Sequence, residues 1–257
     1  MTNKFGITPT GPEEDREADH GAVKPREAAT LVVVRSSPQP TILMGKRAST
    51  HRFMPNKFVF PGGRLDPIDQ HLKTPGELNT DVLERLRKST RKDITDRKLR
   101  GLALAAIRET YEETGLVVGR TATQQLGTQH ATWRSYLEHG VEPPLEKMDF
   151  FARAITPAYQ TRRFDTRFFM VHEEFIQNDP AQVVNTSGEL NDIHWLTFAE
   201  ARALDLPMVT RWAINIVETR IPPTTHAVPD LRPYLQPRVP LLLEADCATQ
   251  KSRRIFG

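Results

Sequence analysis

The hydrophobic and polar positions of the chain divide it into short strand-like runs and a few helix-like segments. Two runs rich in β-branched residues, ATLVVVRSS (29–37) and PTILMGKRAS (40–49), flank the turn-prone sequence SSPQP and predict a hairpin or meander. We expect four further strands, at KFVF (57–60), MDFFARAI (148–155), RFDTRFFMV (163–171) and DIHWL (192–196). Strands interspersed with helices predict a mixed α/β (α+β) domain with some antiparallel pairing.

Apolar residues at helical spacing predict helices in five segments. These are residues 81–88, 95–114, 131–140, 197–204 and 209–220. In the second segment Leu104, Ile107 and Tyr111 form one apolar stripe, which predicts a core face. Asp93 or Thr95 is placed to cap its start, and Gly115 stands where a left-handed residue ends a helix.

Composition separates the chain into an ordered centre and two polar ends. Residues 1–26 are rich in proline, glycine and acidic residues and predict a disordered arm. Residues 27–220 form the predicted domain, and 221–257 form a proline-rich extension. The charged segment at about 70–94 has the character of an insertion within the domain.

The overall balance of residues is that of a soluble globular protein. The 257 residues are 38% hydrophobic and 26% charged, and they include no apolar run long enough to cross a membrane. The first thirty residues lack the apolar core of a secretory signal, and a single Cys247 builds no disulfide framework, so we expect a cytoplasmic protein. The net charge of +3 is small and spread out, so neither nucleic acid nor membrane is an expected partner. The sequence leaves open whether the chain forms a homodimer.

The stretch RETYEETG (108–115) concentrates acidic residues on the second predicted helix. At ~100° per residue, Glu109, Glu112 and Glu113 lie on one side of it. Like charges at this spacing destabilise a helix, so a counter-charge is expected. Mg²⁺ prefers such oxygen ligands and is commonly held by carboxylates together with substrate phosphates. The alternative is a solvated charged face.

With FPGG (60–63) before it, this stretch resembles the Nudix box of Nudix hydrolases. The matching positions are Gly63, Arg108, Glu109, Glu112, Glu113, Gly115 and Leu116. The sequence departs from the box at Thr110, where a bulky apolar residue is usual, and at Asp69, where glutamate is usual. Between Asp69 and Arg108 lie 38 residues instead of the usual seven, so an insertion splits the box. Such a long insertion is similar to that of the mammalian Nudix protein 19 group and its bacterial relatives, the coenzyme A diphosphatases.

This resemblance implies a Nudix fold, in which a mixed β-sheet is sandwiched between α-helices. It also implies a Mg²⁺- or Mn²⁺-dependent enzyme that cleaves the diphosphate of a small-molecule nucleoside diphosphate derivative. By likeness to the coenzyme A diphosphatases, we expect coenzyme A or acyl-CoA to give 3′,5′-ADP and a phosphopantetheine product. ADP-ribose, NADH and nucleoside triphosphates remain alternative substrates. A noncatalytic Nudix-fold sensor is the alternative from another class, although it would be expected to lose carboxylates from the helix.

The resemblance also assigns roles to individual residues. Glu112 and Glu113 are the implied metal ligands, while Glu109 either binds a further metal or helps to deprotonate water. The backbone carbonyl of Gly62 is a further implied ligand. Glu189, in SGELNDIHWL, has the position of a distant fourth catalytic carboxylate. An exposed loop glutamate is the alternative for Glu189, and Glu173 and Glu174 compete with it.

The remaining candidate residues support the site or bind substrate. Arg108 is within ion-pairing reach of Glu112 and is expected to hold it in position, with Gly63, Asp69 and Gly115 completing the box. One guanidinium group can bind two phosphate oxygens at once. Phe164 is a candidate to border an adenine or pantetheine group. The candidate phosphate-binding residues are Arg47, Arg52, Arg162 and Arg163. The alternatives are solvated surface arginines and a core aromatic residue.

Overall fold

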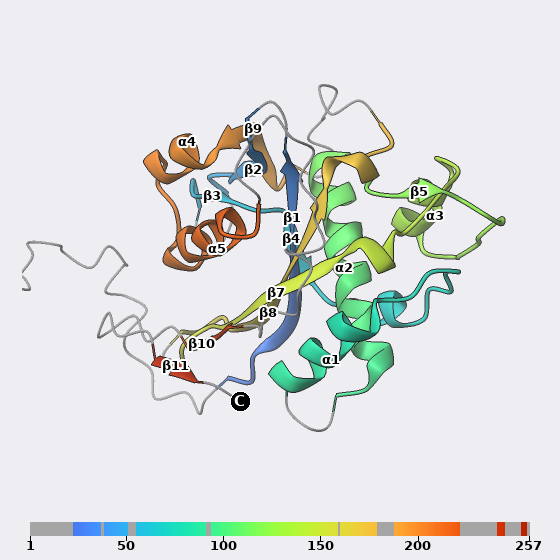
Figure 1. The fold of residues 1–257 in the computed structure, drawn as a ribbon, viewed down its shortest axis with the longest axis horizontal. Coiled ribbons are helices and arrows are strands. Elements are labelled where there is room, and N and C mark those ends of the chain that lie inside the picture. Colours follow the sequence, from blue (N-terminus) through green and yellow to red (C-terminus); the bar gives the residue numbers. More distant parts are fainter. Residues whose placement is uncertain are drawn as a thin grey trace, which may run out of the picture.

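A mixed β-sheet between two layers of helices forms the centre of the molecule in the computed structural model (Figure 1). The structure describes residues 23–36, 39–50, 55–90, 94–158, 160–178, 188–221, 241–244 and 253–255. One face of the sheet is covered by α1 (Thr80–Ser89), α2 (Asp96–Thr114) and α3 (Ala131–Leu137). The other face is covered by α4 (Phe198–Ala203) and α5 (Met208–Glu218). Most of the predicted N-terminal arm and C-terminal extension lies outside the described residues, as do Arg52 and Cys247.

Parallel and antiparallel pairings both occur in the sheet. Its strands are β1 (Arg26–Arg35), β2 (Thr41–Arg47), β3 (Phe58–Val59), β4 (Gly62–Arg64), β7 (Asp149–Ile155), β8 (Phe164–His172), β9 (Leu190–Thr197), β10 (Leu241–Glu244) and β11 (Arg253–Ile255). Among the described residues their order is β11-β10-β7-β8-β1-β2-β3, with β4 paired to β1 and β9 paired to β2. The pairs β1–β8 and β7–β10 are parallel, and the others are antiparallel. The predicted mixed sheet and the β1–β2 hairpin are therefore confirmed.

Several short elements connect these strands and helices. They are β5 (Arg120–Thr121), which pairs with β6 (Val141–Glu142), and the 3₁₀ turns η2 (Pro67–Gln70), η3 (Leu145–Lys147) and η4 (Glu173–Phe175). The sequence patterns did not predict these elements, nor the three-residue strand β4. No helix within the described ranges has both the length and the apolar character needed to cross a membrane.

The apolar run of β1 is explained by helices on both faces of the sheet. Leu31 and Val33 pack into the core beneath α2, whereas Val32 and Val34 pack into the core beneath α5. Side chains alternate between faces along a strand, so a strand covered on both sides needs apolar residues at every position. The central strand therefore joins two separate hydrophobic cores.

The long helix α2 begins and ends where the capping signals predict. The Thr95 hydroxyl accepts a hydrogen bond from the Lys98 amide at 3.3 Å, and Gly115 ends the helix with a φ of 68°. However, the expectation of a single core face is wrong for the middle of the helix, where residues 101–107 are all buried. The reason is that α1 and α3 also pack on α2 and enclose it away from the sheet.

The charged segment predicted as an insertion contributes to the core beneath α2. Its predicted helix is present as α1, and Leu72, Leu78, Val82 and Leu86 are buried in the same cluster as the α2 side chains. Arg85 on α1 donates a hydrogen bond to Asp149 on β7 at 2.7 Å. This segment therefore packs against the domain although its composition is that of a surface loop.

Candidate active site

Two consecutive glycines allow strand β4 to lie directly against the carboxylates of α2. At Gly62 φ is 155°, and a Cβ atom there would lie 2.5 Å from the carbonyl oxygen of Ala29, so a larger residue cannot be accommodated. At Gly63 a Cβ atom would lie 2.4 Å from the Cδ atom of Glu109. The Gly62 amide donates a hydrogen bond to Oε2 of Glu113 at 2.9 Å. The glycines thus bring backbone and carboxylates into contact.

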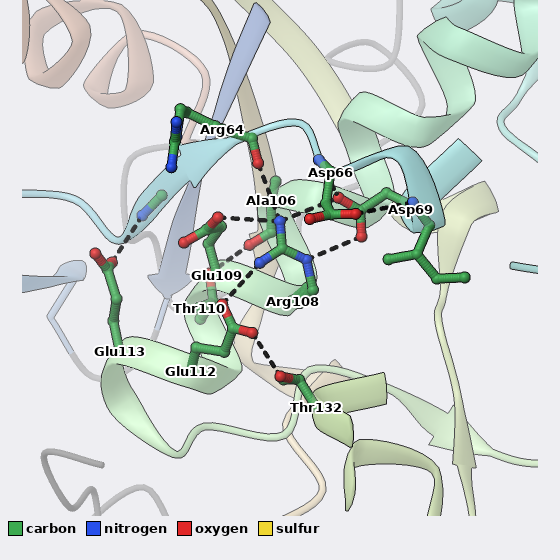
Figure 2. A network of polar contacts seen from close by, with 12 residues as sticks. Arg64, Asp66, Asp69, Ala106, Arg108, Glu109, Thr110, Glu112, Glu113 and Thr132 are labelled. Atoms are coloured by element: carbon green, nitrogen blue, oxygen red, sulfur yellow. Dashed lines mark hydrogen bonds and ion pairs between the residues drawn. The ribbon is translucent and has the colours of Figure 1, made fainter. Parts of the chain in front are cut away.

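Arg108 lies at the centre of a polar network and pairs with two of the three glutamates (Figure 2). Its guanidinium group is 3.0 Å from the carboxylate of Glu109 and 2.7 Å from that of Glu112. It also donates to the carbonyl oxygen of Arg64 at 3.0 Å. Because the arginine is almost completely buried, these ion pairs hold the carboxylates in defined positions. Arg108 links the end of β4 to the last turns of α2.

Asp69 anchors the other side of this arginine. Its carboxylate accepts hydrogen bonds from Nε of Arg108 at 2.9 Å and Nη2 at 3.1 Å, and a third from Nε1 of Trp133 at 2.9 Å. It also accepts a hydrogen bond from the Asp66 amide at 2.9 Å, which completes the cap of η2. The Asp69 side chain has no solvent exposure, so these hydrogen-bond donors, and not water, compensate its charge. This places Asp69 behind Arg108.

Glu112 is held from a second direction by α3. The Thr132 hydroxyl donates a hydrogen bond to Oε1 of Glu112 at 2.6 Å, while Arg108 binds Oε2. The three glutamates therefore leave α2 in different directions, as Figure 2 shows: Glu113 toward Gly62, Glu109 beneath β4 and Glu112 toward Thr132. Helical spacing places them on one side of the helix, but their tertiary partners separate the carboxylate groups.

Burial changes the ionisation of Glu109 and Glu113. It raises the pKa of Glu109 to about 7, against the lowering effect of Arg108 and with a further increase from Glu112. Burial also raises the pKa of Glu113 well above its usual value, although the Gly62 hydrogen bond opposes this effect. For Arg108, burial lowers the pKa, but Asp69 and the neighbouring glutamates raise it overall. Negative charge at Glu109 and Glu113 is therefore incompletely compensated by the protein.

A cavity of about 760 Å³ opens beside the carboxylates and brings most of the predicted site residues together. Those that line it are Arg47, Gly62, Gly63, Glu109, Glu112, Glu113, Arg162, Arg163, Phe164 and Glu189. Asp69, Arg108 and Gly115 do not line it, and the network of Asp69 and Arg108 lies behind the Glu109 and Glu112 carboxylates.

Two of the predicted substrate-binding arginines differ in what surrounds their guanidinium groups. Burial lowers the pKa of Arg47, while the nearby Glu113 and Glu189 raise it. Arg163 donates to the carbonyl oxygens of Thr156 at 2.9 Å and Val23 at 2.7 Å, so its guanidinium group braces the cavity wall.

Of the competing distant carboxylates, Glu189 is the one that lines the cavity. Glu173 pairs instead with Arg35 at 2.8 Å, and Glu174 does not line the cavity.

The three glutamates can bind a metal ion only through carboxylate oxygens. Oxygen ligands are those that a hard divalent cation prefers. No three Asp, Glu, His or Cys side chains converge into a metal-binding cluster in the part of the chain that the structure describes. Arg108 holds an oxygen of Glu112, and the Gly62 amide holds an oxygen of Glu113. A cation would compete with these donors for the same oxygens, and its charge would offset the burial and the secondary repulsion between neighbouring glutamates that raise the Glu109 and Glu113 pKa values.

Several residues at the site had no distinguishing signal in the sequence. Thr132 contacts Glu112, and Trp133 contacts Asp69. Both residues lie on α3, a helix that the sequence predicts without indicating that it packs beside the site. Arg26, Arg64 and the first residues of α5 also line the cavity. Only Arg64 had a local indication, because it follows Gly63 directly.

No protein-family model matches the chain. It is 25% identical over 183 residues to the Caenorhabditis elegans protein "Putative nudix hydrolase 7", an alignment that covers 66% of this chain and 51% of that protein. It is 43% identical over 47 residues to "Uncharacterized Nudix hydrolase NudL" of Yersinia pestis, covering 18% of this chain and 24% of that one. The chain thus spans about half of the nematode protein's length, 51%, and less of the Yersinia protein.

A crystal structure of a NUDIX hydrolase from Alicyclobacillus acidocaldarius matches with a TM-score of 0.55 and 26% identity. The match covers 75% of this chain and 90% of that one. The sequence relatives and the solved structure together support assignment of this chain to the Nudix hydrolase family, and its architecture is the Nudix fold.

Proposed function

We propose that this protein is a metal-dependent Nudix diphosphatase that hydrolyses the diphosphate of a nucleoside diphosphate derivative. The observation that carries the proposal is the cavity beside Glu109, Glu112 and Glu113, with the Gly62–Gly63 backbone against the carboxylates. Arginines line the same cavity, so it offers anionic groups for a cation and cationic groups for phosphates. The Nudix relatives support the same reaction class.

A divalent cation, Mg²⁺ or Mn²⁺, would be held by Glu112 and Glu113, with Glu109 and the carbonyl oxygen of Gly62 nearby. Such a cation neutralises phosphate charge and makes a bound water more acidic. The buried Arg108–Asp69 pair keeps the carboxylates at the cavity wall in the absence of substrate. Asp69 and Arg108 thereby support the site from behind the cavity wall, Gly115 ends the helix that carries the glutamates, and Gly63 allows β4 to approach Glu109.

Glu109 is suited to accept a proton from the attacking water. Its pKa of about 7 lies close to neutral pH, where a general base is most effective. Its carboxylate lies beneath the glycines of β4 and lines the cavity. Glu189 enters the same cavity from the loop before β9 and is the second candidate for this role.

Coenzyme A or an acyl-CoA is the substrate that we propose, with 3′,5′-ADP and a phosphopantetheine compound as products. The support is the split Nudix box, together with a cavity whose lining extends beyond the carboxylates to β7, β8 and α5. Phe164 and Phe168 supply aromatic surface to the cavity lining, and Arg47 and Arg162 supply positive charge. ADP-ribose, NADH and nucleoside triphosphates have the same cleavable linkage and are the competing substrates.

The proposal is tested by product analysis with the full chain. Purified protein is incubated with Mg²⁺ or Mn²⁺ and with coenzyme A, acetyl-CoA, ADP-ribose, NADH or ATP, and products are identified by mass spectrometry. Glu112→Gln should lower the rate by about 10²–10³-fold, because it removes a negative charge that would hold the cation beside the phosphates. Glu138→Gln is the matched control, since Glu138 is exposed and lies outside the cavity.

The outcomes separate the levels of the proposal. Formation of 3′,5′-ADP from coenzyme A compounds, lost in Glu112→Gln and kept in Glu138→Gln, is the expected result. Preferential cleavage of another compound would overturn the coenzyme A assignment and retain the reaction class. If no compound is cleaved although ligands bind, the proposal that the protein is an enzyme would be overturned, and a noncatalytic sensor would be favoured.

A further inference from the structure

Two arginines from neighbouring strands lie side by side at one end of the cavity. Arg64 on β4 pairs with Ala28 on β1, and Arg26 lies two residues before Ala28. Residues opposite each other, and residues two apart on one strand, face the same side of a sheet. Arg26 and Arg64 are therefore diagonal neighbours on one face, about 7–8 Å apart between Cα atoms. Their side chains can reach a common anion.

Neither guanidinium group is occupied within the described chain. The Arg64 carbonyl accepts a bond from Arg108, but its exposed side chain extends away from Arg108 in Figure 2. The exposed Arg26 uses its backbone amide to contact Arg163, and its side chain, like that of Arg64, makes no hydrogen bond or ion pair with the described residues. Nearby, Lys98 pairs with Glu27 at 3.1 Å.

These two arginines stand where two cavities meet. A second cavity, of about 730 Å³, is lined by the end of β4, by η2 and by part of α2. Arg26, Arg64 and Glu109 line both this cavity and the one that contains the three glutamates. A substrate with its diphosphate beside Glu109 would therefore have two uncompensated positive charges at its next group. Guanidinium groups bind phosphate oxygens bidentately, so a phosphate monoester is the ligand that this geometry fits.

We propose that Arg26 and Arg64 bind a phosphate monoester of the substrate, separate from the diphosphate that is cleaved. Assigning this phosphate to a substrate rests on the proposed function, whereas the anion site itself does not. The substrate class is narrowed to nucleoside diphosphate derivatives with an additional ribose phosphate. Coenzyme A should then be preferred over dephospho-coenzyme A if the pair receives a 3′-phosphate, and NADPH over NADH if it receives a 2′-phosphate.

A binding measurement tests the pair without requiring catalysis. Isothermal titration calorimetry in EDTA compares adenosine 3′,5′-bisphosphate, adenosine 2′,5′-bisphosphate and adenosine 5′-monophosphate. The wild-type protein should bind one bisphosphate about tenfold more tightly than the monophosphate, the effect expected for two exposed charge pairs. The Arg26→Gln/Arg64→Gln variant should lose this preference while it retains monophosphate binding. Arg134→Gln should keep the preference, because this exposed arginine lines neither cavity.

The same variants in a hydrolysis assay locate the effect on substrate. The double variant should raise KM for the substrate that carries the extra phosphate and leave that of its counterpart unchanged. A bisphosphate preference that survives in the double variant, or no preference in the wild-type protein, would overturn the proposal. If the wild-type protein cleaves no compound but prefers a bisphosphate through this pair, the diphosphatase proposal fails and the anion site stands.

Discussion

Replacement of Glu109 by glutamine should make the metal-free protein more resistant to alkaline conditions. Glu109 has a pKa of about 7 in the folded protein, against 4.5 for an ordinary glutamate, chiefly because it is buried. Between about pH 4.5 and pH 7, the folded state therefore retains a proton at Glu109 that the unfolded state has lost. The stability of this form is fully present below about pH 4.5 and is lost as the pH rises through about 7. Glutamine resembles the protonated carboxyl group and does not titrate.

The size of the effect follows from the difference between the two pKa values. Each pH unit of difference corresponds to about 1.36 kcal/mol, so the change from 4.5 to about 7 amounts to about 3 kcal/mol. The Glu109 side chain is only 16% exposed, so screening by solvent removes little of this value. Relative to Glu109→Gln, the wild-type protein should thus lose about 3 kcal/mol of unfolding free energy between pH 4.5 and pH 8.

Urea denaturation in EDTA, followed by tryptophan fluorescence at pH 5 and pH 8, measures this difference. The Glu138→Gln protein should follow the wild-type pH dependence, because Glu138 is exposed. Addition of Mg²⁺ at pH 8 should restore stability to the wild-type protein more than to Glu109→Gln, because the ion binds the folded carboxylates. Equal pH dependence in wild-type and Glu109→Gln would refute the reasoning that burial leaves this carboxylate uncompensated.

Two further substitutions test the supports of the site. Gly63→Ala places a Cβ atom where it would lie 2.4 Å from Cδ of Glu109. The resulting shift should lower kcat/KM by about 10²-fold and the free energy of unfolding by about 1–3 kcal/mol. An unchanged kcat/KM would contradict the close approach of Gly63 to Glu109. Trp133→Phe removes a hydrogen bond to the buried Asp69 and should cost about 1–3 kcal/mol in urea denaturation. Trp212→Phe, at a partly exposed position, is its control and should cost less; an equal loss would exclude a special role for the Asp69 contact.

Local patterns were sufficient to predict the regular elements around the site. The alternation and β-branched content of residues 29–49 predicted the β1–β2 hairpin, and α2 was bounded by Thr95 and Gly115. These features depend on interactions within a few residues, which a linear sequence displays directly. The spacing of Glu109, Glu112 and Glu113 was readable for the same reason, because a helix has a fixed rotation per residue.

Other features depended on contacts between distant parts of the chain. The burial of α2 around its circumference follows from α1 and α3, and the anchoring of Arg108 by Asp69 joins residues 39 positions apart. The three-residue strand β4 is too short to carry a periodic signal, yet its pairing with β1 places Arg64 beside Arg26.

The sequence by itself determined which carboxylates share a helix and which glycines lie next to the site. Tertiary structure decided where each carboxylate points, because Gly62, Arg108 and Thr132 provide different partners for them. It also decided that Arg108 and Arg163 are engaged by other residues, whereas the side chains of Arg26 and Arg64 have no partner among the described residues. The physical reason is that hydrogen bonds and ion pairs form between atoms brought together by sheet register and packing, which nearest-neighbour patterns do not encode.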